Sequence, residues 1–395
     1  MPALSRRGEH MTFSPIRSLI PYAREAKSKG VHVHHLNIGQ PDIETPPIAL
    51  ERLREYDQRI IKYGASEGSQ ELREVVSAYY TKHVAAVTAD DIYVTTGASE
   101  AISFVLFSCF EPGQEIIIPE PFYANYMGFA HVSGVVLRPV ESRIEDSFGL
   151  PSPQSFVEKI TQQTKAIFLC NPGNPTGNLY SKEDIIAIGA LVREHNLFLI
   201  VDEVYREFCY DQEFYSVLQL EGLEEHIIVI DSVSKVFSSC GSRIGFIVTR
   251  SEPLKLSILK YAQLRLCPPM IGQHLAIACF EHRDTYIADV RCEYDSRRNY
   301  LYHRLSQIQD VVCYKPKAAF YNMTQLPVED TRHFCQWLLE SFELEGETLM
   351  LAPGPGFYLS NHMGRDQVRI AFVRGRSDLE KAMNILERGL QVYNA

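Results

Sequence analysis

The sequence predicts an α/β protein with two domains: a large one built on a mostly parallel sheet sandwiched by helices, and a smaller α+β one. Two observations predict this fold class. From residue 92, short β-rich runs alternate with amphipathic stretches, the order of elements that builds a parallel sheet. After about residue 285 the pattern changes to a helical stretch, two short strands around Phe320 and Val368, and a Pro/Gly-rich link at 352–357. A chain of 395 residues is long enough to bury a core in both domains.

The residue patterns predict the elements in order along the chain. A helical pattern begins near Pro15 with its apolar residues on one face, so the residues before it are expected to form a loose arm. Ser181 stands three residues before Asp184 and predicts a capping box at the start of a helix that reaches His195. The six expected strands of the sheet lie at 92–95, 115–118, 166–170, 198–202, 227–231 and 244–248.

The composition argues against several classes of partner. With 39 basic and 49 acidic residues the net charge is −10 at pH 7, whereas nucleic acid or an anionic membrane would require a basic surface. No run approaches the roughly 18 apolar residues of a membrane helix. The nine cysteines form no Cys-x-x-Cys pair, which favours reduced thiols and a cytoplasmic location over a zinc site or disulfides. Met11 is an alternative start to Met1.

Polar residues follow four of the expected strands, at the edge where ligands bind in sheets of this kind. After the run 92–95, the stretch 96–100 reads Thr-Gly-Ala-Ser-Glu and opens a helical pattern whose free N–H groups suit a phosphate. Taken alone, an ordinary glycine turn with a serine cap explains that stretch better. After the run 166–170, NPGNPTG at 171–177 predicts a rigid loop in which the Asn174 amide can donate to an oxygen anion, although a simple turn asparagine is the alternative.

The other two strand ends carry ionisable groups. Asp202 directly follows four apolar residues, where burial raises a carboxyl pKa unless a cation compensates, so a partner such as a protonated ring nitrogen is expected. A helix N-cap is the alternative for this aspartate. Lys235 follows Ser-Val-Ser at 232–234, and Arg243 lies eight residues later beside two glycines. A lone lysine there is usually a surface residue, but together these groups can neutralise a phosphate and supply an amine nucleophile.

No motif for a metal site stands out in the sequence. His32, His34 and His35 alternate on an expected strand, so at most two of them share a face. We therefore expect a solvated strand edge there and no metal.

Eight stretches, in order along most of the chain, resemble the class I/II aminotransferases of the fold-type I pyridoxal-phosphate superfamily, to which aspartate aminotransferase belongs. They are LNIGQPD (36–42), KYGASEGSQELREVV (62–76), TTGASEAI (95–102), PEPFYANY (119–126), NPGNPTG (171–177), DEVY (202–205), SVSKVFSSCGSRIG (232–245) and QVRIAF (367–372). The resemblance implies a flexible arm at 1–15, a segment at 16–45 that joins the small domain, a cofactor-binding large domain at 46–284 and a small C-terminal domain at 285–395.

The resemblance also implies a pyridoxal 5′-phosphate site. Lys235 looks like the lysine that holds the cofactor as a Schiff base and later, as a free amine, moves a proton between the substrate α-carbon and the cofactor. Asp202 would keep the ring nitrogen protonated, and Tyr205 and Asn174 would reach the phenolic oxygen. Contacts of this kind from Asp202, Tyr205 and Asn174 would keep the cofactor ring able to withdraw electrons from the substrate.

Further residues match the family's cofactor and subunit contacts. Tyr123, or its neighbour Phe122, would stack on the ring face, where the family commonly has a tryptophan. Tyr63 resembles the residue that reaches the phosphate of the neighbouring subunit, which implies a homodimer with shared sites. The phosphate would also contact the backbone of Ala98 and Ser99 and the side chains of Ser232, Ser234 and Arg243.

The implied substrate site centres on an arginine. Arg369 in the Val-Arg-Ile stretch has the planar fork that suits a bidentate grip on an α-carboxylate, with Gly39 and Asn174 as further substrate-binding residues. Glu100 stands near the place where some aspartate-selective relatives carry a lysine for the distal carboxylate. This departure weakens an assignment to aspartate.

The leading hypothesis is therefore a transaminase that passes an amino group between an L-amino acid and a 2-oxo acid, such as 2-oxoglutarate or pyruvate, by a ping-pong route through pyridoxamine phosphate. A C–S lyase or an enzyme like aminocyclopropane-carboxylate synthase would use a very similar scaffold. A non-catalytic effector module of a transcription regulator is disfavoured, because only about 35 residues precede LNIGQPD, too few and not basic enough for a DNA-binding extension.

Overall fold

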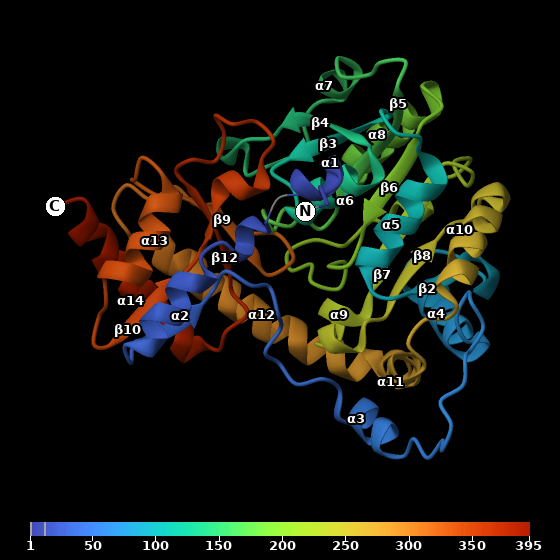
Figure 1. Ribbon diagram of the computed structural model, residues 1–395, viewed down its shortest axis with the longest axis horizontal. Helices are drawn as coiled ribbons and strands as arrows, with labels where there is room; N and C mark the ends of the chain where they lie inside the picture. The colour runs from blue at the N-terminus through green and yellow to red at the C-terminus, as the bar shows by residue number, and fades with distance from the viewer. Residues whose placement is uncertain (1, 12) are drawn as a thin grey trace.

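The computed structural model describes residues 2–11 and 13–395, and a seven-stranded sheet forms the centre of its larger part (Figure 1). The strand order is β2-β8-β7-β6-β5-β3-β4. Only β8 runs against its neighbours, and the other pairs are parallel, so the predicted α/β class with a mostly parallel sheet is confirmed. The strands are β2 (Ile92–Thr95), β3 (Glu115–Glu120), β4 (Val136–Glu141), β5 (Thr164–Cys170), β6 (Phe198–Asp202), β7 (Ile227–Ser232) and β8 (Gly245–Val248).

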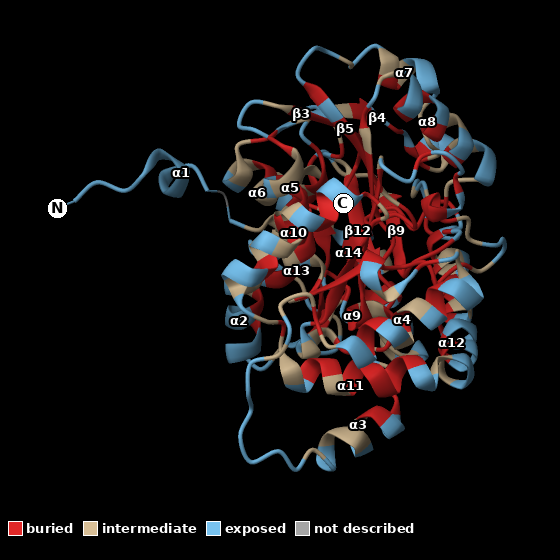
Figure 2. Ribbon diagram, turned by 90° about the vertical axis from the view of Figure 1, so that its right-hand side faces the viewer, coloured by how far each residue is buried: buried red, intermediate tan, exposed pale blue. Residues whose placement is uncertain are grey.

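Helices cover both faces of this sheet because its central strands are apolar on both sides. In β6, Leu199 and Val201 join one buried cluster and Ile200 joins another, as the two-residue period of a strand requires. The first cluster packs under α4 (Gln70–His83), α8 (Lys182–Glu194) and α11 (Met270–Glu281), and the second under α5 (Ala98–Cys109), α6 (Asn125–Ser133) and α10 (Glu252–Arg265). Figure 2 shows these buried residues gathered inside the helical layers.

The smaller part combines the two ends of the chain around a separate apolar cluster. β1 (His32–His35) pairs in parallel with β10 (Glu347–Met350), and β9 (Tyr321–Gln325), β11 (Ala352–Pro353) and β12 (Gln367–Ala371) form an antiparallel sheet. Around them lie α2 (Ile20–Ser28), α13 (Thr331–Ser341) and α14 (Arg376–Tyr393). α12 (Arg283–Leu305) contributes Ile287 to the core of the large part and Val290 to the core of the small part. The predicted domain boundary near residue 285 falls within this helix and stays a prediction.

The predicted capping box at the start of α8 is confirmed. The Asp184 N–H donates to Ser181 Oγ at 3.1 Å, and the Ser181 N–H donates to Asp184 Oδ2 at 2.9 Å. The remaining helices are short: α1 (Arg6–Glu9), α3 (Pro47–Arg54), α7 (Pro153–Val157) and α9 (Val233–Val236), with 3-10 turns η1 (Pro15–Arg17), η2 (Ala89–Asp91), η3 (Ile144–Asp146), η4 (Val217–Gln219), η5 (Cys240–Ser242) and η6 (Gly354–Phe357).

The predicted N-terminal arm projects from the body of the molecule and carries α1 (Figure 2). Met1, one of the two alternative starts, lies outside the described residues. Within residues 2–11 and 13–395, no helix combines the length and apolar character needed to cross a membrane.

The structure corrects the expectation of a solvated edge at His32, His34 and His35. His34 is buried, and its Nε2 lies 3.1 Å from Glu347 Oε2, because β1 pairs with β10 along its whole length. Lys27 Nζ lies 2.8 Å from His35 Nε2. Across the described parts of the chain, no three His, Cys, Asp or Glu side chains are grouped as metal ligands.

Candidate active site

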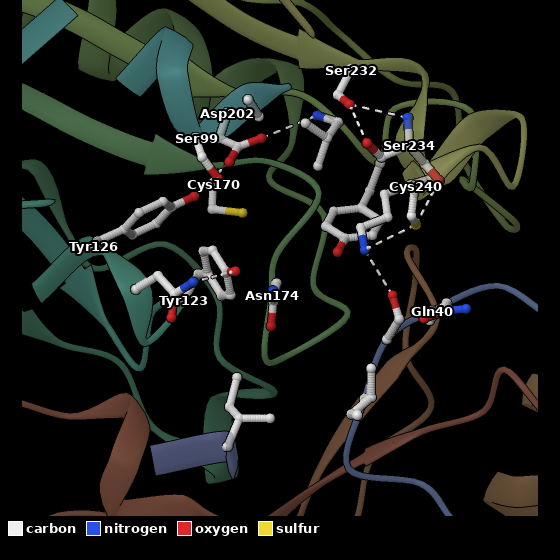
Figure 3. A pocket seen from close by; sticks show the side chains of 18 of the residues that line it. Gln40, Ser99, Tyr123, Tyr126, Cys170, Asn174, Asp202, Ser232, Ser234 and Cys240 are labelled. Carbon is white, nitrogen blue, oxygen red and sulfur yellow. Dashed lines mark hydrogen bonds between the residues drawn. The ribbon is translucent and has the colours of Figure 1, made fainter. Parts of the chain in front are cut away.

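A cavity of about 420 Å³ lies between the carboxyl ends of the central strands and the smaller part of the molecule. Its walls come from the segments after β2, β3, β5, β6 and β7, from β9 and β12, and from two N-terminal stretches, 14–17 and 38–40. Figure 3 shows side chains from both parts pointing into this space. Of the predicted site residues all but Tyr63 line it: Gly39, Ala98, Ser99, Tyr123, Asn174, Asp202, Tyr205, Ser232, Ser234, Lys235, Arg243 and Arg369.

Lys235 reaches into the cavity from α9, which begins directly after β7. Its Nζ donates to the Gly39 carbonyl oxygen at 2.7 Å and lies 4.0 Å from Cys240 Sγ. Burial lowers the pKa of the Lys235 amine, and the positive charge of Arg369 acts in the same direction. A lysine in this environment gives up its proton more readily than a surface lysine, so it can act as a nucleophile or base.

Asp202 ends β6 and is only 5% exposed. Its Oδ2 accepts a hydrogen bond from the Tyr126 hydroxyl at 2.7 Å, and its Oδ1 accepts one from the Val204 N–H at 3.2 Å. Burial raises the pKa of Asp202 to about 6, although both hydrogen bonds oppose that shift. The carboxylate is therefore ionised at neutral pH but incompletely compensated, which is the environment that favours a cationic ligand.

The start of α5 and the loop after α9 form a site suited to an anion. Ala98 and Ser99 are the first residues of α5, so their N–H groups have no acceptor within the helix. Arg243 lies beside them and donates to the Thr96 carbonyl at 3.3 Å. A Cβ at Gly245 would lie 2.4 Å from the Gly97 carbonyl carbon, so only glycine lets β8 pass this close. These donors, with the Ser232 and Ser234 hydroxyls 2.7 Å apart, fit a phosphate group.

A buried charge network fixes the end of β7 beneath these serines. Asp231 Oδ1 accepts from the Ser232 N–H at 2.7 Å, and its Oδ2 accepts from the Tyr80 hydroxyl at 3.0 Å. Arg206, buried beside it, donates to the same Oδ2. Because the pair is desolvated and its polar contacts are directional, it holds Ser232 in one orientation.

Arg369 enters the cavity from β12 and is 2% exposed. Its Nη1 donates to Asn174 Oδ1 at 3.0 Å and its Nη2 to the Asn37 carbonyl at 2.5 Å, while its guanidinium lies over the rings of Tyr321 and Phe357. Its buried Nε has no hydrogen-bond partner, and it forms no salt bridge with any residue in the described ranges. A buried cation without a carboxylate partner is costly, so this arrangement fits an anionic ligand.

The sequence did not indicate two tyrosines that the structure brings to this site. Tyr126 donates to Asp202, and the Tyr321 hydroxyl lies 2.8 Å from that of Tyr205. Tyr126 stands within a stretch that carries the family resemblance, PEPFYANY (119–126), whereas Tyr321 stands outside the eight stretches. A buried aromatic residue has no sequence pattern that distinguishes it from core packing. Between the two predicted stacking residues, Tyr123 lines the cavity, whereas Phe122 is absent from its walls.

Two residues lie elsewhere than their sequence context suggested. Glu100 turns away from the cavity: its Oε2 accepts from Arg265 Nη1 at 2.5 Å and from the Thr96 N–H at 2.8 Å. It therefore stabilises the turn before α5. Tyr63 is 80% exposed and lies outside the cavity of its own chain, and its predicted role in a neighbouring subunit stays a prediction.

A model of the family "Aminotransferase class I and II" matches residues 31–386, nearly the whole chain. The chain belongs to this family. The aminotransferase is 30% identical over 382 residues to an aspartate aminotransferase of Pyrococcus horikoshii, with 95% of each chain covered. It is also 29% identical to the aromatic-amino-acid aminotransferase 2 of Thermococcus litoralis, with 98% of each covered.

Solved structures agree with that assignment. The aminotransferase superposes on the alanine aminotransferase of Pyrococcus furiosus with a TM-score of 0.91 and 28% identity, over 99% of this chain and 100% of the other. The protein is thus a transaminase with the fold of the aspartate aminotransferases. Members of this family generally depend on pyridoxal 5′-phosphate. The names of these relatives cover acidic, aromatic and small neutral amino acids, so family membership alone leaves the substrate open.

Proposed function

We propose that this aminotransferase uses pyridoxal 5′-phosphate to move an amino group between an L-amino acid and a 2-oxo acid, either 2-oxoglutarate or pyruvate, in two half-reactions at one site. One observation carries the proposal. A half-buried lysine amine, an incompletely compensated buried aspartate and a buried arginine without a carboxylate partner face the same cavity. Each of the three supplies what one part of the reaction requires: an attachment point, a charge for the ring and a grip on the substrate.

The chain's residues fit the cofactor part by part. Lys235 Nζ would hold its aldehyde carbon covalently, and Asp202 would pair with its ring nitrogen. Tyr205 and Asn174 would contact the phenolic oxygen, and Tyr123 would lie on the ring face. The anion site would hold the phosphate through Ala98, Ser99, Ser232, Ser234 and Arg243. When bound, the cofactor supplies a ring that withdraws electrons from the substrate α-carbon.

Lys235 is the group that would move the proton. Burial lowers the pKa of its amine, so a larger share of the free amine is neutral near pH 7 than for an ordinary lysine. Nζ would take the proton from the substrate α-carbon and deliver it to the cofactor carbon that had carried the aldehyde, and it would move a proton in the opposite direction in the reverse half-reaction. The Gly39 carbonyl, 2.7 Å away, orients the amine.

Arg369 would bind the substrate α-carboxylate. Its guanidinium is held by the Asn174 side chain and the Asn37 carbonyl, which leaves Nε without a partner before substrate binds. A Cβ at Gly39 would lie 1.7 Å from the Tyr321 hydroxyl, so glycine is needed where the two N-terminal and C-terminal segments meet. This close packing places the Gly39 backbone beside the proposed carboxylate site.

The half-reaction with the amino donor alone tests the proposed function. The protein loaded with pyridoxal phosphate and given a panel of L-amino acids should release one equivalent of 2-oxo acid per site and then stop. Adding 2-oxoglutarate or pyruvate should restart turnover, because the two half-reactions share one site. Continuous release of pyruvate and ammonia from a cysteine conjugate without an acceptor would instead indicate a lyase. No reaction with any donor would contradict the proposal.

We also propose a homodimer in which Tyr63 completes the phosphate site of the partner subunit. Tyr63 lies in an exposed stretch with two exposed isoleucines, Ile60 and Ile61, at 68% and 57% exposure. Leu264, at 81%, follows on α10. Exposed apolar residues of this number are typical of a surface covered by another chain.

The cytoplasmic location suggested by the composition stays a prediction, and all nine cysteines are free.

Mixing two inactive variants tests the shared site. Tyr63→Ala removes the residue from one chain and Lys235→Ala from the other, so a mixed dimer contains one intact site. After unfolding and refolding together, half of the dimers are mixed and one of two sites in each is intact, which predicts about a quarter of wild-type activity. Activity no higher than the average of the two variants, with mixed dimers demonstrated by mass, would contradict a shared site.

A further inference from the structure

The cavity holds more positive charge than the proposed cofactor contacts require. Four cations line it, Arg17, Lys235, Arg243 and Arg369, and Asp202 is the only carboxylate among its lining residues. In the proposed function Arg243 contacts the phosphate, Asp202 pairs with the ring nitrogen, Lys235 holds the aldehyde carbon and Arg369 binds the α-carboxylate. Arg17 is left without an anion.

Arg17 is held at the edge of the cavity by contacts that lead back to Arg369. It ends η1, whose Ile16 carbonyl accepts from Asn37 Nδ2 at 3.3 Å, and the carbonyl of the same Asn37 accepts from Arg369. On the other side of η1, Pro15 packs so closely on η6 that a Cβ at Gly356 would lie 2.4 Å from Pro15 Cβ. The backbone of η1 is therefore fixed relative to the arginine that would bind the α-carboxylate.

The Arg17 side chain itself is uncommitted. It is exposed, and within residues 2–11 and 13–395 its guanidinium makes neither a hydrogen bond nor a salt bridge. Its charge nevertheless reaches the interior of the site: burial raises the pKa of Tyr123, and the charges of Arg369 and Arg17 both oppose that rise. The Tyr123 hydroxyl, which accepts from Asn125 Nδ2 at 2.8 Å, thus lies within the field of both arginines.

We propose that Arg17 binds the distal carboxylate of the substrate, so that the site prefers four- and five-carbon dicarboxylic amino acids and 2-oxo acids. This inference rests on the proposed function, because it takes Arg369 as the partner of the α-carboxylate. Arg17 is an unpaired guanidinium that lines the same cavity as Arg369. It can therefore make a charge-assisted contact with the second carboxylate of a dicarboxylate, which a neutral side chain cannot make. Glu100, the residue that weakened an assignment to an acidic substrate, is paired with Arg265 outside the cavity and does not repel such a substrate.

The test compares acceptors and unreactive ligands in the holoenzyme. Arg17→Met keeps the apolar stem and removes the charge, and it should lower the ratio of kcat/KM for 2-oxoglutarate over pyruvate by roughly 10- to 100-fold, the range of a lost hydrogen bond to a charged group. Calorimetry should show the same loss for glutarate relative to butyrate, which measures binding without turnover. Arg17→Lys should restore part of both ratios, because it returns the charge without the fork.

Arg24→Met is the matched control, because Arg24 is an exposed arginine on the neighbouring α2, outside the cavity. It should leave both ratios unchanged. Equal effects of the two substitutions would overturn the proposal, since they would indicate a diffuse charge effect. Wild-type transamination with unchanged ratios in Arg17→Met would also overturn it while leaving the proposed function intact. Failure of the wild-type protein to transaminate any donor would instead contradict the proposed function.

Discussion

Replacing Lys235 by alanine should reduce transamination by roughly 10⁴-fold or more, because the proposed site loses both its covalent attachment point and its base. The cofactor should still bind, more weakly, through the phosphate contacts and Asp202. Its absorption should then match that of the free aldehyde, without the shift that attachment to an amine produces. Steady-state kinetics and an absorption spectrum of the variant loaded with pyridoxal phosphate check both parts.

The loss should not come from unfolding. Burial lowers the pKa of Lys235, so the folded protein disfavours the protonated amine, and this cost is present below the ordinary lysine pKa. At neutral pH the cofactor-free variant should therefore be at least as stable as the wild type in a thermal melt. Lys260→Ala, which removes an exposed lysine from α10, serves as the control and should keep full activity. Activity of Lys235→Ala within tenfold of the wild type would contradict the assignment.

Replacing Asp202 by asparagine should lower kcat/KM by roughly 10²- to 10⁴-fold, the range expected when one partner of a buried ion pair is removed. The side chain keeps its size, and its amide oxygen can still accept from Tyr126, although the hydrogen bond from the Val204 N–H is then lost. What is lost is the negative charge that would keep the ring nitrogen protonated. Asp289→Asn, at an exposed position on α12, is the control.

The same substitution should change how cofactor binding depends on pH. The pKa of Asp202 is raised to about 6 in the cofactor-free protein, so below pH 6 the carboxyl must release a proton before it can pair with a cationic ring. Below pH 6 the affinity of the wild type for the cofactor should therefore fall as the pH decreases, and it should fall by up to tenfold per pH unit more than the affinity of Asp202→Asn does. Fluorescence titrations from pH 5 to 8 measure this difference, and identical slopes would contradict the proposed pairing.

Several features of the site could be predicted because they depend on local chain order. Asp202 and Lys235 stand directly after apolar runs, and the ends of parallel strands converge at one edge of a sheet. The glycine turn before α5 has a similarly local signature, since Gly97 has a φ of 75°, a backbone conformation that favours glycine. These residues were predicted together, and they line one cavity.

Other features depend on contacts between distant segments, which no local pattern reports. The antiparallel direction of β8 follows from the path of the chain after Lys235, and its apolar run resembles those of the parallel strands. Tyr126 and Tyr321 look like core aromatics until the fold brings their hydroxyls to Asp202 and Tyr205. Arg17 lies far from Arg369 in the sequence, and the long-range contacts through Asn37 relate them.

The burial of His34 has the same kind of cause. A short strand with three histidines resembles an exposed edge, yet β10, more than three hundred residues later, covers it. The proposed role of Tyr63 would also depend on a long-range contact, in this case with a second chain. Such contacts are set by tertiary and quaternary packing, which overrides local propensity.

Reductive trapping tests the central claim most directly. The wild-type protein is loaded with pyridoxal phosphate, treated with borohydride to fix the cofactor to the amine that holds it, digested, and mapped by mass spectrometry. The account predicts the cofactor mass on the peptide that contains Lys235, with no labelled peptide from Lys235→Ala at the same ratio. Stoichiometric labelling at a different lysine, or an active enzyme that traps no cofactor, would contradict it.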